Sequence, residues 1–429
     1  MLTIYSPHTS PRFEYICKVL FQLVLKVPYE VTNSKDVFLK AEGVKIAYGE
    51  PFEVEDILAI PDYGLLWEQE IRKPFARFDI SNWQELPTLF SFKGTKYPFD
   101  IFSASFYLIT RYEEYNATDL DTHGRFKAVN ALQYKMGAVD KPLVELWAFQ
   151  LAKEIGLQSA KILNPQSFFK QQLTIDIDSA WVYKNYNISY TIKRIAKKLL
   201  VFKWGELFTM LKVLSGLEKD PGDSYNWIKE YQNKTGQKIR CFALIGNGKG
   251  VDKCIPHSNK NFQKLLKQLK AESEELGIHP SYASNSSFNR LKKEIDTLST
   301  IAGEQISHSR QHFLKLEFPN TYRNLIKAGI KYDYTMGWAE QAGFRAGISI
   351  PFPFFDLEEN LEKELQIIPF IAMDRTLKDY MSLSPTQAKK EVNKLIDNCK
   401  NIGGQAILLW HNTSLSDKGE WKGWKNIIS

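Results

Sequence analysis

The chain has 429 residues, of which 44% are hydrophobic and 24% charged, and it carries a net charge of +7 at pH 7. These values are ordinary for a soluble globular protein, exclude a disordered chain or a fibrous repeat, and suggest two or three domains. The positive excess is small for this length, so we expect no nucleic-acid partner.

The sequence also disfavours the membrane-spanning and secreted classes of protein. No stretch approaches the ~20 apolar residues that a membrane-spanning helix needs. The first residues, MLTIYSPHTSPRF, lack the basic and apolar segments of a secretory signal. The four cysteines lie far apart and form no C-x-x-C pair, which disfavours a disulfide framework. We therefore expect a cytoplasmic protein.

Residues 1–165 are predicted to form a smaller α/β domain. Its expected elements are short strands and helices at 2–5, 43–48, 88–92, 97–115 and 142–155. The apolar stripe of the first expected helix is typical of a packed core rather than of a binding site. We find no chemical signature in this region.

Residues 166–429 show a different pattern, in which strands and helices alternate. Strands are expected within 173–181, 239–246, 304–314, 367–373 and 406–412, and helices within 259–277, 286–299, 319–329 and 384–404. This alternation predicts a (β/α) barrel or a doubly wound sheet. In either fold, functional side chains gather at the carboxyl ends of the strands.

A helical insertion is predicted at about 182–238. It contains the basic amphipathic stretch TIKRIAKKLLVFKW (191–204). Two interpretations stay open for this stretch: a solvated helix face, or a helix in peripheral contact with an anionic membrane surface.

Two aspartates close the first strand of the second region. Asp176 and Asp178 stand at i and i+2, so they project from the same face of the strand. Two carboxylates this close repel each other unless a cation or a shared proton relieves them. The alternatives are a metal site, with one carboxylate as ligand and the other as base, and an aspartate pair that caps a turn.

Histidines stand at the ends of other predicted strands. His279 in LGIHPSY and His411 in ILLWHN each follow an apolar run. His308, Arg310 and His312 are spaced i, i+2, i+4, which would place all three on one face of a strand. Burying such groups is costly without partners, and the two aspartates would supply them. We interpret these residues as one constellation.

The motifs that contain these residues resemble those of the polysaccharide deacetylases, the chitooligosaccharide-deacetylase-like carbohydrate esterases. TIDID is similar to the first family motif, SRQHF to the arginine motif and LLWHN to the final histidine motif. The stretch 331–354 resembles a segment of divergent bacterial members associated with surface-polysaccharide synthesis. The resemblance covers about residues 170–415 and leaves residues 1–165 as a region of unknown function.

The resemblance implies a distorted (β/α) barrel for the second region and a divalent metal, most often zinc. It also implies hydrolysis of N- or O-acetyl groups of sugars. By resemblance, Asp176 is the general base, Arg310 orients it, and His411 is the general acid. Asp178 and His279 are metal ligands by the same resemblance.

The expected partner is an acetylated carbohydrate. Tyr282 and Trp410 lie beside motif residues and could stack on sugar rings. Arg345 lies in the segment that resembles the divergent bacterial members and could contact the substrate.

The sequence departs from the family pattern at two positions. Ile177 separates two aspartates that the family motif has side by side, and Ala283 stands where that motif has a second histidine ligand. We expect His312 to replace this ligand, because zinc in a catalytic site takes three protein ligands and keeps one position open. The alternatives are His308, a water molecule, or loss of tight metal binding.

Three hypotheses for the function follow. The first is a metal-dependent deacetylase that acts on a sugar or a lipid-linked sugar, in the biosynthesis of a surface polysaccharide. The second is a catalytically inactive carbohydrate-binding protein, which Ala283 favours. The third is hydrolysis of another bond, such as an amide unrelated to sugars, on the same fold.

Overall fold

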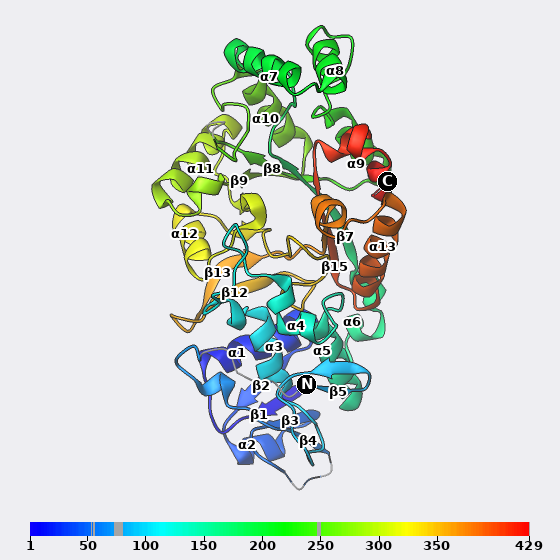
Figure 1. Ribbon diagram of the computed structural model, residues 1–429. Helices are drawn as coiled ribbons and strands as arrows, with labels where there is room; N and C mark the ends of the chain where they lie inside the picture. Colours follow the sequence, from blue (N-terminus) through cyan, green and yellow to red (C-terminus); the bar gives the residue numbers. More distant parts are fainter. Residues whose placement is uncertain (53, 55, 73–79, 247–249, 429) are drawn as a thin grey trace.

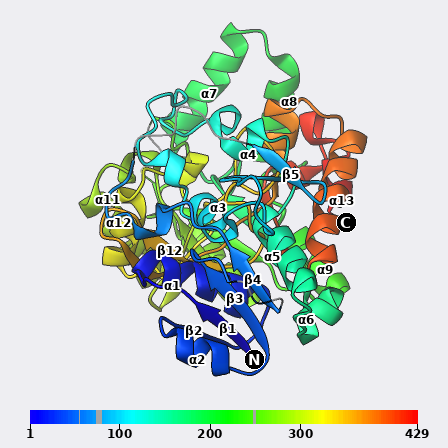
Figure 2. The same cartoon turned by 90° about the horizontal axis from the view of Figure 1, so that it is seen from below.

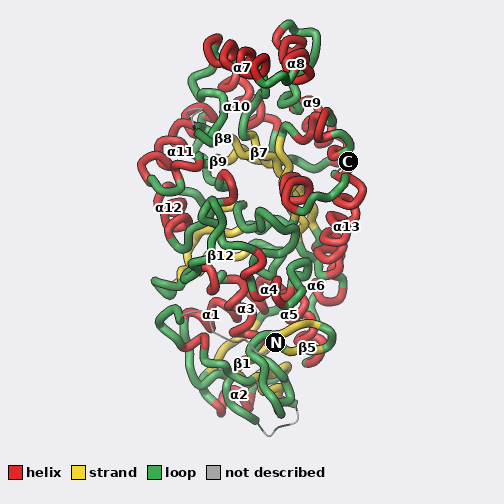
Figure 3. The backbone as a smooth tube through the Cα atoms, viewed as in Figure 1, coloured by secondary structure: helices red, strands yellow, loops and turns green. Residues whose placement is uncertain are grey.

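The chain is organised around two sheets. The computed structural model describes residues 1–52, 54, 56–72, 80–246 and 250–428. Figure 1 shows the first sheet at the lower end of the molecule and the second sheet above it. Figure 3 shows the helices of the second region arranged around its strands.

The first sheet has four parallel strands in the order β2-β1-β3-β4. All residues of β1 are buried, as expected for the interior of a parallel sheet. The elements of this region are β1 (Leu2–Tyr5), α1 (Pro11–Cys17), β2 (Tyr29–Thr32), α2 (Lys35–Lys40), β3 (Val44–Tyr48), β4 (Ile57–Ile60), β5 (Ser81–Trp83), β6 (Leu86–Thr88), α3 (Ile101–Ile109), α4 (Leu132–Lys135), α5 (Leu143–Glu154) and α6 (Ala160–Leu163).

The predicted strand at 88–92 is wrong. Strand β6 ends at Thr88, and Phe90 has a φ of 57°, which interrupts an extended backbone. The strand predicted at 2–5 is confirmed, and that at 43–48 begins one residue later than expected.

The second sheet has nine strands in the order β12-β13-β11-β10-β9-β8-β7-β15-β14. Its pairings are parallel except for that of β12 with β13. The strands are β7 (Lys170–Ile177), β8 (Arg240–Leu244), β9 (Glu275–His279), β10 (His308–Ser309), β11 (Tyr332–Asp333), β12 (Phe352–Asp356), β13 (Leu361–Ile367), β14 (Ala372–Met373) and β15 (Gln405–His411).

This sheet curls without forming the closed barrel that the resemblance implies. Strand β13 pairs with β11, β14 pairs with β15, and only residues 368–371 separate β13 from β14. One chain segment therefore borders both sides of the curled sheet, and Ile371 N donates to Ile407 O. Among the described residues, no ladder joins the end strands β12 and β14. The second region is a mixed α/β fold around a mostly parallel sheet.

Helices connect the strands of the second region. A capping box formed by Ser384 and Gln387 begins the last long helix, inside the range predicted for it. The helices are α7 (Ile188–Leu200), α8 (Trp204–Leu214), α9 (Tyr225–Thr235), α10 (Lys260–Glu272), α11 (Phe288–Ala302), α12 (Asn320–Ala328) and α13 (Pro385–Asn401). None of the described helices combines the length and apolarity that crossing a bilayer requires.

A buried interface joins the two regions. The guanidinium of Arg345 forms two hydrogen bonds with the Glu114 carboxylate, at 2.5 and 3.0 Å, and both side chains are 3% exposed. Ser349 donates its N–H and O–H to Glu145 Oε1 at 2.7 and 2.6 Å. One hydrophobic core includes residues of both regions. The division of the chain into domains at residue 165 stays a prediction.

Candidate active site

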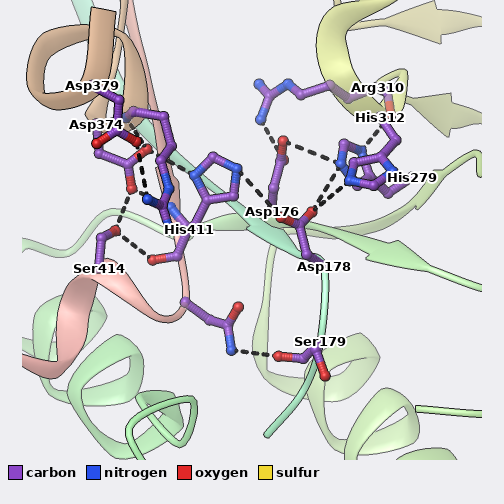
Figure 4. Close-up of polar contacts among 12 residues, drawn as sticks. Asp176, Asp178, Ser179, His279, Arg310, His312, Asp374, Asp379, His411 and Ser414 are labelled. Atoms are coloured by element: carbon purple, nitrogen blue, oxygen red, sulfur yellow. Dashed lines mark hydrogen bonds and ion pairs between the residues drawn. The ribbon is translucent and has the colours of Figure 1, made fainter. Parts of the chain in front are cut away.

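The polar residues expected at strand ends meet at one edge of the second sheet. Strands β15, β7, β8 and β9 are neighbours and parallel, so their carboxyl ends lie on the same edge. Asp178 follows the last residue of β7, and His279 and His411 are the last residues of β9 and β15. Asp176 lies opposite His411 in the ladder between β7 and β15. Figure 4 shows these side chains pointing toward one another.

Three of these groups could hold a metal ion. One ligand atom from each of Asp178, His279 and His312 lies within 4.8 Å of the other two. His279 Nε2 is 3.2 Å from Asp178 Oδ1, and His312 Nε2 is 3.7 Å from the same oxygen. Carboxylate and imidazole donors in this number suit a catalytic zinc site.

Hydrogen bonds orient both imidazoles. His279 Nδ1 lies 2.6 Å from the carbonyl oxygen of Arg310, and His312 Nδ1 lies 2.9 Å from Asp252 Oδ1. Since both partners only accept, each Nδ1 must carry a proton, and in the neutral ring each Nε2 then holds its lone pair. This arrangement is typical of histidines that bind a metal.

The electrostatics of the site favour a cation. Asp178 Oδ1 is buried and accepts no hydrogen bond from the residues that the structure describes, although it faces the two Nε2 atoms. Burial lowers the pKa of His279, but the carboxylates of Asp176 and Asp178 outweigh this effect and raise it overall. Acceptors that converge in this way repel one another unless a proton or a metal ion lies between them. The donor set therefore fits a divalent metal.

Asp176 forms a buried ion pair with Arg310. Arg310 Nη1 donates to Asp176 Oδ1 at 2.8 Å, and its other nitrogens donate to Thr174 Oγ1 at 2.8 Å and to Tyr334 O at 3.0 Å. The second carboxylate oxygen of Asp176 lies 3.8 Å from His279 Nε2. The guanidinium thus fixes one oxygen of Asp176 and leaves the other directed toward the histidines.

His411 lies on the opposite side of Asp178 and is held by Asp374. His411 Nδ1 is 2.7 Å from Asp374 Oδ1, its backbone N–H donates to Asp374 Oδ2 at 2.8 Å, and its Nε2 is 3.7 Å from Asp178 Oδ2. Ser414 also donates to Asp374. Burial lowers the pKa of His411, but the carboxylates of Asp374 and Asp178 offset this and raise it to about 9. These carboxylates favour the protonated form of His411.

A cavity of about 370 Å³ opens over these groups. Phe313, Leu314, Met373 and Tyr380 give it an apolar side. Arg125 of the first region also lines it and donates to Phe313 O at 2.9 Å and to Tyr380 Oη at 3.1 Å. The first region thus contributes directly to the wall of this cavity.

The cavity does not include all of the residues predicted from the sequence. Trp410 is fully buried, and because neighbours in a strand alternate in direction, it points to the opposite face from His411. Arg345 is buried in its ion pair with Glu114 and does not line the cavity. Neither side chain lines this cavity, and a contact of either one with substrate stays a prediction.

Tyr282 lies beside the cavity rather than in it. Its ring contacts Phe313, which lines the cavity, at a centroid distance of 5.3 Å, and its N–H donates to Asp252 Oδ1 at 2.9 Å. Its backbone supports the aspartate that orients His312. A contact of its ring with substrate stays a prediction.

The expected strand through His308 and His312 is also wrong. Strand β10 contains only His308 and Ser309, and Phe313 has a φ of 62° in the turn that follows. His308 stacks on Tyr332 at 4.6 Å and lines a different cavity from that of His312. This placement removes His308 as the replacement ligand.

Sequence reasoning missed three residues. Asp374 directly follows β14, and Asp252 lies in the segment that follows β8. An aspartate placed after a strand of a parallel sheet is a signal that could have found both. Arg125 carries no such signal, because it comes from the other region of the chain.

Comparisons with known proteins found a match to one family of unknown function and weak similarity to several solved structures. A family model described as DUF7033, a family of unknown function, matches residues 2–159. No curated protein matches the chain.

Three solved structures resemble about three-fifths of the chain. A Mycobacterium smegmatis protein assigned to the polysaccharide deacetylases is 13% identical over 61% of this chain and 82% of its own, with a TM-score of 0.40. A polysaccharide deacetylase from Bacillus cereus is 13% identical over 60% and 84%, with a TM-score of 0.30. A Pseudomonas aeruginosa protein assigned to the same group is 9% identical over 65% and 89%, with a TM-score of 0.39. Similarities this low do not allow the function of these proteins to be assigned to this chain.

Proposed function

We propose that the chain is a metal-dependent hydrolase that removes acetyl groups from a sugar or a glycan intermediate. The main support is the arrangement of three groups around one cavity. Asp178, His279 and His312 offer a facing donor set, while Asp176 and His411 flank it with their own orienting partners.

A divalent cation, with zinc the best match to one carboxylate and two imidazoles, would be held by Asp178, His279 and His312. When bound, such a cation supplies Lewis-acid chemistry that polarises an acyl carbonyl and acidifies water. Asp252 and the carbonyl of Arg310 keep both imidazoles in the tautomer that this role requires.

Two residues of the chain would carry out the two proton transfers of a hydrolysis, one as base and one as acid. Asp176 is placed to accept a proton from a water molecule in the cavity, and Arg310 keeps this carboxylate oriented through a charge-assisted hydrogen bond. His411, with a pKa of about 9, is protonated at neutral pH and can donate to the leaving nitrogen or oxygen. Transfer of an acyl group to water needs a base that accepts the proton of the water and an acid that protonates the leaving group. A carboxylate and an imidazolium meet these two needs.

The assignment to acetylated sugars depends on the motif resemblance together with the cavity. The apolar side formed by Leu314 and Met373 suits a small acyl group such as acetyl. A role in surface-polysaccharide biosynthesis is part of the same proposal and is based on the resemblance of 331–354.

Two measurements on the purified chain test this proposal: bound metal by elemental analysis, and acetate release from an acetylated amino sugar. We expect one metal ion per chain, and acetate release that Asp176→Asn abolishes. His312→Ala should lose the metal, whereas His308→Ala, which changes a histidine outside the site, should keep it. Full metal occupancy in His312→Ala would rule out His312 as a ligand.

The inactive carbohydrate-binding protein remains the second candidate. Ala283, in place of the second histidine of the family motif, is the observation that favours it. Binding of an acetylated sugar without acetate release or bound metal would support this alternative. A filled metal site with no release from any acetylated sugar would instead favour hydrolysis of another bond.

A further inference from the structure

The helical hairpin of α7 and α8 exposes an unusual amount of apolar surface. Figures 1 and 2 show the two helices projecting beyond the rest of the molecule, on the side away from the first sheet. The turn between them, residues 201–203, and the adjoining helix ends together read LLVFKW (199–204). Leu200 is 79% exposed and Phe202 is 76% exposed. Soluble proteins rarely leave such consecutive large apolar side chains in water without a partner.

The apolar surface continues from the turn along both helices. In α7 the exposed residues recur at helical spacing, which places them along one face. In α8 a similar set follows the turn. The exposed large apolar residues of the hairpin are Ile188, Ile192, Leu199, Leu200, Val201, Phe202, Trp204, Phe208, Leu211 and Leu214.

The other side of the hairpin packs against the segment that directly precedes α7. Leu207, Met210 and Val213 of α8 are buried, and the last two pack with Tyr183 in a small separate core. The Asp220 carboxylate accepts three backbone N–H groups of residues 182–184 at 2.8–2.9 Å. The hairpin is thus a supported structure, and the exposed face is its outer side.

The charge of the hairpin is strongly positive. Between residues 188 and 217 the basic side chains are Lys193, Arg194, Lys197, Lys198, Lys203 and Lys212, and the acidic side chain is Glu206 alone. Glu206 pairs with Lys198 and Lys203. Lys193, Lys197 and Lys212 are exposed and form no ion pair within the described part of the chain.

We propose that this hairpin binds the surface of an anionic phospholipid membrane, with its tip, residues 199–204, entering the interface between headgroups and acyl chains. Interfacial helices bind membranes through two contributions. Their apolar side chains enter the interface, and their lysines contact the lipid phosphates. A second copy of the chain is a poorer occupant, because a symmetric contact through this face would bring lysine against lysine.

The experiment is co-sedimentation of the full chain with vesicles of phosphatidylcholine, alone or mixed with phosphatidylglycerol. We expect binding to the mixed vesicles that weakens as salt is added, and little binding to phosphatidylcholine alone. The double variant Leu200→Ser, Phe202→Ser should bind the vesicles at least about tenfold more weakly. Burial of each such side chain in the membrane raises the partition coefficient by more than about tenfold. The double variant Lys193→Glu, Lys197→Glu should also weaken binding, by ~10-fold or more.

A matched control separates the hairpin from exposed apolar residues in general. Leu163→Ser changes a side chain that is 69% exposed in the first region, and it should leave vesicle binding unchanged. Circular dichroism should show that all variants fold, since the substituted side chains are exposed. No substrate is present, so failure of the proposed hydrolysis would leave this result untouched.

Three outcomes would overturn the proposal. The first is equal binding of the wild-type chain to both kinds of vesicle, or to neither. The second is full binding by the Leu200→Ser, Phe202→Ser variant. The third is a wild-type dimer in light scattering that this variant converts to a monomer without any vesicle binding, which would identify a second copy as the occupant.

Discussion

Both regions of the molecule place aspartates beside the ends of parallel strands, but these aspartates have different environments. In the first region, Asp62 accepts from Tyr48 Oη at 3.0 Å, from Gly64 N at 2.6 Å and from Trp67 Nε1. Asp100 accepts the backbone N–H groups of Tyr63 and Ser103, one at each carboxylate oxygen, and the second of these lies at the start of α3. All four carboxylate oxygens therefore have protein donors, and they support turns and a helix start.

In the second region, the corresponding aspartate is not satisfied. Within the described part of the chain, no group donates a hydrogen bond to the buried Asp178 Oδ1, which faces the Nε2 atoms of His279 and His312. Buried acceptors are normally paired, so an unpaired one among other acceptors requires an explanation. The comparison teaches that an aspartate at a strand end is not by itself a sign of a site. The sign is a converging set of acceptors without donors.

The largest expected effect comes from a matched pair of aspartate variants, one in each region. Asp178→Asn should lose the bound metal and slow hydrolysis about a thousandfold or more, because a bound metal supplies several kcal/mol of transition-state stabilisation. Asp62→Asn should keep the metal and the rate but lower the free energy of unfolding by ~1 kcal/mol, because one acceptor is lost. Elemental analysis, acetate release and urea unfolding measure these effects. Metal retained in Asp178→Asn would contradict the proposed difference between the aspartates of the two regions.

The next effect concerns the acid of the proposed reaction. Asp374→Asn should let the pKa of His411 fall and should favour the wrong tautomer of its ring, since an amide can donate to Nδ1. His411 acts when protonated, so the alkaline limb of kcat/KM against pH should move to lower pH. Loss of general acid catalysis costs ~10²–10⁴ in rate. Metal content should not change, and an unshifted pH profile would exclude this role.

The interface between the regions should affect stability rather than chemistry. Arg345→Met leaves Glu114 with only Arg111 as a buried partner, and breaking a buried pair costs ~3–5 kcal/mol. We expect a lower melting temperature but an unchanged KM for the folded protein, because Arg345 does not line the cavity. A raised KM with unchanged stability would restore Arg345 as a substrate contact.

The smallest effect is the pH dependence of this interface. Burial raises the pKa of Glu145 from 4.5 to about 7, although hydrogen bonds from Ser349 oppose the shift. The folded state therefore holds this proton more tightly than the unfolded state, so stability falls as pH rises from about 4.5 to about 7. Glu145→Gln should remove that part of the dependence, on the order of 1–3 kcal/mol. Urea unfolding of both proteins at pH 5 and pH 8 measures the difference, and identical pH slopes would contradict it.

Much of the second region could be predicted because its pattern is local. Apolar runs located β7 and β15, so that Asp178 directly follows the first strand and His411 ends the second, as their sequences indicate. The helix predicted at 259–277 is too long, because α10 ends at Glu272 and residues 275–279 form β9, which ends at His279. His312 lies beside Asp178 as expected but for a different reason. A turn places it there, whereas the strand that the spacing of 308–312 indicated does not form.

The direction of one side chain was also within reach of the sequence. Trp410 and His411 are adjacent in a strand, and adjacent side chains point to opposite faces. Once His411 is assigned to the cavity, Trp410 must lie in the core, where it is fully buried. The prediction of a sugar contact at Trp410 considered sequence proximity and overlooked this alternation.

The sequence alone determined where strands β7 and β15 end and which ionisable residues stand at those ends, because hydrophobic periodicity is a property of neighbouring residues. Only the tertiary structure decided that Asp252 and Asp374 orient His312 and His411, and that Arg125 reaches the cavity from the first region. Those hydrogen bonds join residues far apart in the chain. They depend on how the sheet curls and how the two regions pack, and no local pattern records that geometry.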